Sequence, residues 1–147
     1  MRVNKNLTLV VALISFLGVT NSYAEEHVIN AQARVFNPDI IYVQPGDTVK
    51  FINMTSHDAK SVEGLIPVGA QPFDSGLGNN LTLQLDTEGV YGYVCVPHIG
   101  FGMVGVIVVG NPVNIDAEMD FAKGNLKGPY RRLIGKLLKV QRAAQGS

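Results

Sequence analysis

Four residues of this chain have side chains that can bind a soft metal ion: Cys95, His98, Met103 and, further upstream, His57. Thiolate and thioether sulfur suit Cu(I), and imidazole suits either oxidation state of copper. A trigonal Cys-His-His site with a weak axial methionine is the donor set of blue-copper centres, which transfer electrons. The sequence therefore predicts one copper ion, cycling between Cu(I) and Cu(II), at these four residues.

Each residue taken alone also has an ordinary structural interpretation. A lone cysteine is often a small buried hydrophobe, and a lone histidine is more often a hydrogen-bonded polar residue than a ligand. Met103 begins an apolar strand and could simply fill space in the hydrophobic core. Zinc is the nearest inorganic alternative, but structural zinc sites use four Cys or His donors, and methionine is not a usual ligand. A Cys–His nucleophile is the enzymatic alternative, and the sequence offers it no oxyanion hole or substrate cleft. The joint spacing favours copper, and we do not expect an enzyme.

The N-terminal segment predicts export. Residues 1–24 combine Arg2 and Lys5 with an apolar run and with Ser22-Tyr23-Ala24, which has the small residues of a peptidase site. We expect a cleaved secretory signal peptide at 1–24, a single domain at 25–147 and export from the cytoplasm. We expect no integral membrane span, because the apolar run is shorter than the roughly 20 residues that cross a bilayer. The chain has one cysteine, which cannot form an internal disulfide in an oxidising compartment, and this supports a metal-binding role.

The expected domain is mostly β, a Greek-key antiparallel β-sandwich over 25–111 followed by a helical tail over 112–147. Short stretches rich in β-branched and aromatic residues are separated by turn formers such as Pro45-Gly46-Asp47. The expected strands cover residues 31–36, 40–43, 48–53, 81–86, 90–96 and 103–109. In the tail we expect one or two helices, at 116–123 and from Pro129 onward.

The second tail helix is expected to be amphipathic, with apolar residues on one side and basic residues on the other. The apolar residues are Leu133, Ile134, Leu137 and Leu138, and the basic ones are Arg131, Arg132, Lys136, Lys139 and Arg142. We interpret the basic side as the solvated face of a helix packed on the sandwich rather than as a surface for an acidic or membrane partner. Removing Arg2 and Lys5 from the 12 basic residues leaves 10 against 12 acidic residues, a net charge of −2, so nothing indicates binding to nucleic acid.

The expected strands bring the four donors together. Cys95 lies at the end of one strand and Met103 at the start of the next, so His98 shares one connecting loop with both. His57 follows the strand at 48–53, and loops from different strands can meet at the same end of a sandwich. The remaining histidine, His27, is interpreted as a surface residue near the mature N-terminus rather than as a ligand.

Several segments closely resemble the pseudoazurin family. They are Pro45-Gly46-Asp47-Thr48-Val49, Gly89-Val90-Tyr91, Cys95-Val96-Pro97-His98 and Gly102-Met103-Val104-Gly105, with His57 between the first two. The resemblance implies a type 1 copper cupredoxin, a soluble periplasmic electron carrier with His57, Cys95, His98 and Met103 as the ligands. It also implies protein redox partners of the copper nitrite reductase or c-type cytochrome class, and we expect a monomer.

Two departures from the family pattern lie near the predicted site. Asp58 stands where the family usually has Asn after the first ligand histidine, and we hypothesise that its charge lowers the reduction potential and makes it pH-dependent. The segment 71–78 lacks the lysines that pseudoazurins typically place around the later ligand histidine, so attraction of acidic partners should be weaker. Two other functions stay open, a periplasmic copper-binding or delivery protein without redox turnover and a non-metal sandwich used in adhesion.

Overall fold

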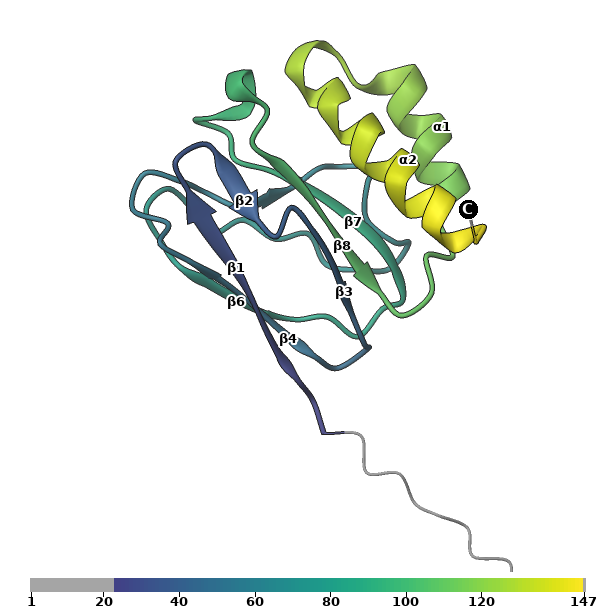
Figure 1. Ribbon diagram of the computed structural model, residues 1–147, viewed down its shortest axis with the longest axis horizontal. Coiled ribbons are helices and arrows are strands. Elements are labelled where there is room, and N and C mark those ends of the chain that lie inside the picture. Colours follow the sequence, from purple (N-terminus) through teal and green to yellow (C-terminus); the bar gives the residue numbers. More distant parts are fainter. Residues whose placement is uncertain (1–22, 147) are drawn as a thin grey trace, which may run out of the picture.

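The computed structural model describes residues 23–146, so most of the predicted signal peptide at 1–24 lies outside the described residues. Two four-stranded sheets face each other (Figure 1). The first has the order β2-β1-β4-β6 and consists of β1 (Glu26–Gln32), β2 (Val35–Asn37), β4 (Thr48–Ile52) and β6 (Leu81–Gln84). The second has the order β3-β8-β7-β5 and consists of β3 (Ile40–Val43), β5 (Lys60–Ser61), β7 (Gly89–Val94) and β8 (Val104–Val109).

The strand pairing is mixed. The expected sandwich with C-terminal helices is confirmed, but β1 pairs with β4 and β3 pairs with β8 in parallel, while the other pairings are antiparallel. Most pairings are thus antiparallel as expected, and the two parallel pairings are a departure from that pattern. The reason is that the chain crosses into the second sheet at β3 before it returns to the first sheet at β4. Parallel neighbours need such a crossover, whereas antiparallel neighbours can be joined by a tight turn.

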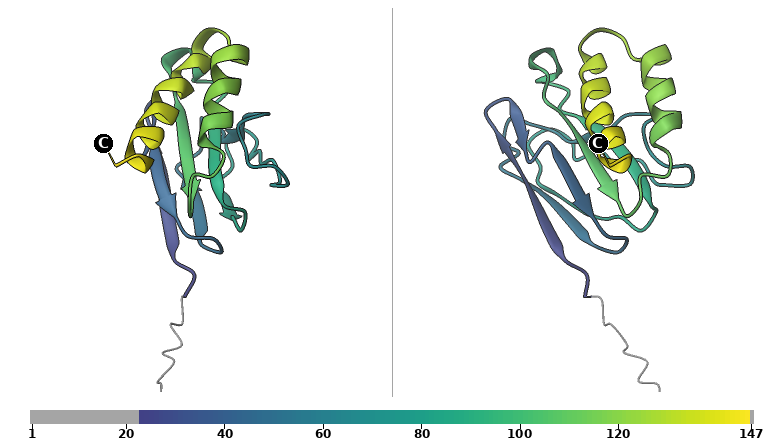
Figure 2. Two further views of the ribbon diagram at one scale, coloured as in Figure 1. Left: turned by 90° about the vertical axis from the view of Figure 1, so that its right-hand side faces the viewer. Right: turned by 45° about the vertical axis from the view of Figure 1, so that its right-hand side comes forward.

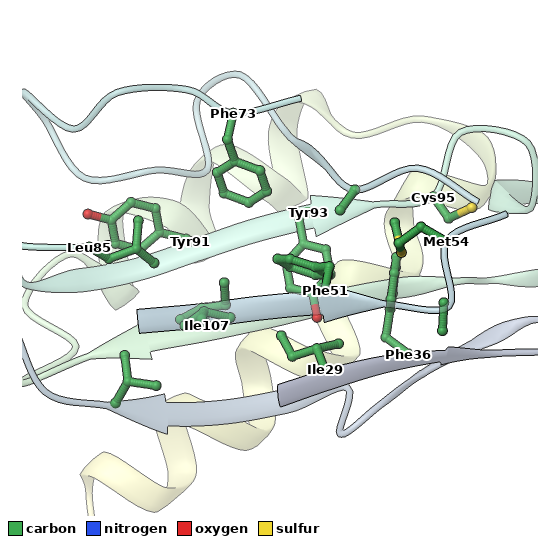
Figure 3. Close-up of a cluster of buried hydrophobic side chains, with 14 of the residues drawn as sticks. Ile29, Phe36, Phe51, Met54, Phe73, Leu85, Tyr91, Tyr93, Cys95 and Ile107 are labelled. Atoms are coloured by element: carbon green, nitrogen blue, oxygen red, sulfur yellow. The ribbon is translucent and has the colours of Figure 1, made fainter. Parts of the chain in front are cut away.

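Strands β7 and β8 belong to the second sheet, which lies between the first sheet and the C-terminal helices. Every residue of both strands is buried. Because successive side chains point to opposite faces of a strand, Tyr91 and Tyr93 enter the cluster between the two sheets (Figure 3), whereas Val90 and Val94 pack on the helical side. Both strands are therefore apolar without alternation, and they hold the ends of the loop that contains Cys95 in a rigid position.

Two helices cover the outer face of the second sheet, side by side (Figures 1 and 2). They are α1 (Ile115–Asn125) and α2 (Arg132–Ala144), and Pro129 lies in the short 3-10 helix η2 (Gly128–Arg131) that precedes α2. No helix in residues 23–146 is long and apolar enough to cross a bilayer.

Helix α2 packs on the sandwich with an apolar face, as expected, but Leu138, predicted for that face, is 37% exposed and Ile134 is only half-buried. Leu133, Leu137 and Val140 are fully buried, and each such side chain contributes roughly 1.5–3 kcal/mol of apolar burial. The side chain of Lys136 bonds to the Asp39 carboxylate at the start of β3, which links the outer side of the helix to the sheet as well.

Candidate metal centre

The loop between β7 and β8 carries three of the four predicted donors and is closed by its own backbone. The Cys95 N–H donates to the Met103 carbonyl at 2.9 Å, and the His98 carbonyl accepts from the N–H of Met103 at 3.3 Å. Between them lies the 3-10 helix η1 (Ile99–Phe101), which ends at Gly102 in a left-handed conformation with φ 85°. That conformation favours glycine, so the residue type at 102 helps the loop to turn back into β8.

The fourth donor comes from the segment after β4. The N–H of His57 donates to the Met54 carbonyl at 2.8 Å, and the His57 carbonyl accepts from the N–H of Gly78 at 2.9 Å. Its neighbour Asp58 joins this segment to the cysteine loop, because its Oδ1 accepts from the N–H of Val96 at 2.6 Å. The acid at position 58 thus fills a structural role as a hydrogen-bond acceptor, which an asparagine side-chain oxygen could also fill.

Both imidazoles present a nitrogen to the same sulfur. The Sγ of Cys95 lies 3.7 Å from Nδ1 of His57 and 3.4 Å from Nδ1 of His98, and the three donor atoms all lie within 4.8 Å of one another. Bonds of about 2.0–2.3 Å from sulfur and nitrogen to a first-row metal ion, at angles between tetrahedral and trigonal, separate such donors by roughly 3.5–3.8 Å. The separation of 3.7 Å falls in this range and that of 3.4 Å lies just below it, so the three residues fit a single bound ion.

Met103 and Cys95 share one buried environment. Both side chains have 0% exposure and belong to the cluster between the sheets, and Figure 3 shows Cys95 at the end of that cluster. Burial raises the pKa of the Cys95 thiol above its usual value, while hydrogen bonds from the backbone amides of Asp58 and His98 lower it. Burial also lowers the pKa of His57, with the nearby His98 acting in the same direction. A neutral imidazole is the form that binds a metal.

One histidine of the pair reaches towards the surface. His57 is 5% exposed, whereas His98 is partly exposed. The Phe101 ring lies 6.2 Å from the His98 ring and is 56% exposed. The Arg34 guanidinium stacks on Phe101 at 3.8 Å from the ring centre, a cation–π contact.

Sequence reasoning missed two basic residues beside the loop. Arg34 comes from the turn between β1 and β2, and the side chain of Arg132, at the start of α2, lies against Gly102. Neither position is near Cys95 in the sequence, so no local signal could have indicated them. His27, in turn, lies away from the cluster and bonds to Asp47 at 2.8 Å.

The fold and the donor set define a cupredoxin, a two-sheet protein that holds copper in loops at one end. Residues 24–110 match the family model described as copper binding proteins, plastocyanin/azurin family, and the chain belongs to this family. Its cofactor is one type 1 copper ion, and it is a blue-copper electron-transfer protein.

Relatives of this chain include pseudoazurins as well as plastocyanins, and the pseudoazurins confirm the resemblance. The pseudoazurin of Paracoccus pantotrophus is 37% identical over 98 residues, a match that covers 63% of this chain and 68% of that protein. The putative pseudoazurin of Rhizobium leguminosarum bv. viciae is 42% identical over 86 residues, covering 57% of each chain. The crystal structure of native pseudoazurin from Hyphomicrobium denitrificans superposes with a TM-score of 0.67 at 34% identity, covering 78% of this chain and 97% of that one.

Proposed function

We propose that His57, Cys95, His98 and Met103 are the copper ligands, and that the chain carries single electrons between protein partners in the periplasm. The observation that carries this proposal is the convergence of two imidazole Nδ1 atoms on one buried sulfur, at 3.7 Å and 3.4 Å. Copper supplies the change of oxidation state, and the protein supplies a fixed set of donors. The Cys95 thiolate and the two imidazoles would hold the ion, and Met103 would add a weaker sulfur donor.

The rigid surroundings of the donors support electron transfer rather than simple storage. The cysteine loop is closed by backbone hydrogen bonds, and Asp58 ties it to the His57 segment. Buried side chains in a close-packed interior have little room to move. A donor set that keeps its positions in both oxidation states lowers the rearrangement that accompanies each electron transfer, so the metal can cycle quickly.

Redox titration distinguishes a carrier from a copper-delivery protein. The copper-loaded protein is reduced with ascorbate and reoxidised over several cycles, in the presence of a Cu(I) chelator that competes at micromolar affinity. A carrier bleaches and regains its blue colour in full, and the chelator stays empty. Transfer of copper to the chelator on the first reduction would favour delivery, and absence of stoichiometric copper would favour a non-metal sandwich.

The exposed surface around His98 supports docking of a redox partner. His98 is the ligand nearest to solvent, and transient redox complexes bury small interfaces, below about 1,200 Å² in total. Segment 71–78 supplies no lysines here, but Arg34 and Arg132 place positive charge at the edge of this surface, which favours an acidic partner face. Copper nitrite reductases and c-type cytochromes are the partner classes that the family resemblance suggests.

The docking proposal is tested by the salt dependence of electron transfer. In stopped-flow measurements with an acidic partner, Arg34→Ala should lower the second-order rate constant by about two- to tenfold at low ionic strength, and the difference should vanish at high salt. Lys139→Ala is the matched control, because Lys139 is an exposed basic residue further along α2. Equal effects of the two substitutions would contradict a docking role for Arg34.

Export is supported by the basic and apolar pattern of residues 1–24. Expression of the full chain in a Gram-negative host should place the protein in the periplasmic fraction, whereas a chain without residues 2–24 should stay in the cytoplasm. Equal distribution of the two forms would remove the support for a signal peptide.

A further inference from the structure

The buried carboxylate of Asp47 binds the backbone nitrogen of Glu25. Asp47 is 5% exposed and lies in the turn between β3 and β4. Its Oδ1 accepts from the N–H of Glu25 at 2.8 Å, while its Oδ2 accepts from the N–H of Gln44 and bonds to Nε2 of His27, both at 2.8 Å. The Glu25 carbonyl in turn accepts from the N–H of Thr48 at 2.9 Å. Both backbone polar groups of Glu25 are thus hydrogen-bonded, although β1 begins only at Glu26.

The bonded nitrogen belongs to the residue that follows the predicted cleavage point. Tyr23 is 85% exposed, Ala24 is also exposed, and both lie before the first strand, so the Ala24–Glu25 peptide bond is open to a peptidase. Hydrolysis of that bond consumes one water molecule and leaves a carboxylate on Ala24 and an ammonium group on Glu25. The nitrogen that donates as an amide in the longer chain then carries a positive charge.

We propose that Asp47 is a receptor for the α-ammonium group of the processed chain, so that removal of residues 1–24 converts an amide hydrogen bond into an ion pair that fastens β1. The distance of 2.8 Å lies in the range of about 2.7–2.9 Å typical of charge-assisted hydrogen bonds. This inference rests on the proposed export and cleavage, and it does not depend on the copper site.

The neighbouring charges favour an ammonium group at this position. The Glu26 carboxylate is paired with Lys50 at 2.7 Å, and the Asp86 carboxylate, from the turn between β6 and β7, lies near Gly46, the residue before Asp47. Hydrogen bonds from the Glu25 and Gln44 amides, together with His27, lower the pKa of Asp47 to about 2, so this carboxylate is charged at neutral pH. The side chain of Glu25 itself is also acidic, and it is exposed.

The test compares copper-loaded chains that differ only at the N-terminus. One begins at Glu25 with a free amine, and the other begins at Glu25 with an acetylated amine, which restores an uncharged amide. An ordinary α-amine has a pKa of about 7.7–8.0, and the pairing should raise that value by one unit or more. The gain in stability is then fully present below about pH 7.7 and is lost as the pH rises through the higher folded-state pKa.

The expected result is a Tm about 2–4 °C higher for the free-amine chain at pH 7, with the difference vanishing near pH 11. In Asp47→Asn chains the two termini should give the same Tm at every pH. Because that substitution disturbs three hydrogen bonds, the comparison of the unsubstituted chains decides the question by itself. Equal Tm values of the free-amine and acetylated chains at pH 7 would overturn the proposal.

A second measurement separates this proposal from the copper assignment. Mass spectrometry of the protein recovered from the periplasm should give a mature chain that begins at Glu25. A chain that begins at any other residue would overturn the receptor proposal and leave the copper proposal intact. A chain that begins at Glu25 but is not blue would overturn the copper proposal and leave the receptor proposal intact.

Discussion

A buried carboxyl group on α1 makes the stability of the domain depend on pH. Glu118 is 4% exposed. One of its oxygens accepts from the side-chain amide of Asn114, and the other has no hydrogen-bond partner among residues 23–146. Burial raises the pKa of Glu118 from its usual 4.5 to about 8, although the bond from Asn114 opposes the change. At neutral pH this side chain is therefore protonated in the folded protein.

The direction and size of the pH effect follow from proton binding in the two states. Between pH 4.5 and about 8 the unfolded chain has released the Glu118 proton and the folded chain has kept it, so the free energy of unfolding falls as pH rises. Each pH unit in this window removes about 1.4 kcal/mol, and the whole window removes at most roughly 5 kcal/mol. That is an upper limit, because any opening of α1 that admits water to the carboxylate makes its ionisation easier.

Glu118→Gln removes the ionisation and keeps an oxygen that can accept from Asn114. The free energy of unfolding is measured by urea titration at pH 5, 6, 7 and 8, followed by far-UV circular dichroism because the chain has no tryptophan. The variant should gain stability relative to the original chain progressively from pH 5 to pH 8. Asp120→Asn is the control, since Asp120 is exposed on the same helix. A stability difference for Glu118→Gln that does not change with pH would refute the reasoning.

Four further substitutions test the core and the metal site. Gly105→Ala should reduce the free energy of unfolding by about 1–3 kcal/mol, because a Cβ there would collide with the Tyr93 ring. Gly124→Ala should instead raise it by up to about 1 kcal/mol, because Gly124 lies in α1 with open space around it. Urea titrations that give the reverse order would contradict this packing. Asp58→Asn should raise the reduction potential measured by protein-film voltammetry by on the order of 60 mV, since it removes a negative charge that favours Cu(II), and an unchanged or lower potential would disprove the hypothesis. Met103→Leu should also raise the potential, because loss of a donor disfavours Cu(II); a potential equal to that of the original protein would show that Met103 is not a ligand.

The candidate donors can be chosen from the sequence because their chemistry is local. Cys95, His98 and Met103 lie in one loop between two apolar strands, so their proximity needs only the correct assignment of those strands. His57 required the further expectation that loops meet at one end of a sandwich, and the structure places its Nδ1 3.7 Å from the Cys95 sulfur. Strands at 40–43 and 104–109 were also close to prediction, since turn formers mark their ends.

Other features depend on contacts between distant segments and gave no local signal. The strand expected at 31–36 is interrupted by a turn at Ala33 and Arg34, where Ala33 has a φ of 50°, a conformation uncommon for alanine. The position of Arg34 over Phe101 follows from this turn and was missed with it. The buried state of Glu118 depends on how α1 packs against β7. The sequence of the helix alone would place Glu118 among its solvent-exposed acidic residues.

X-ray absorption at the copper edge tests the central claim most directly, because it reports the donor atoms of the metal in both oxidation states. The account predicts one short copper–sulfur distance and two imidazole nitrogens in the oxidised protein, with the same shell and only small changes after reduction. Loss of the short sulfur distance in Cys95→Ser should accompany loss of the blue colour. A copper environment of nitrogen and oxygen alone in the unsubstituted protein, or a reduced shell that exchanges its ligands, would contradict the account.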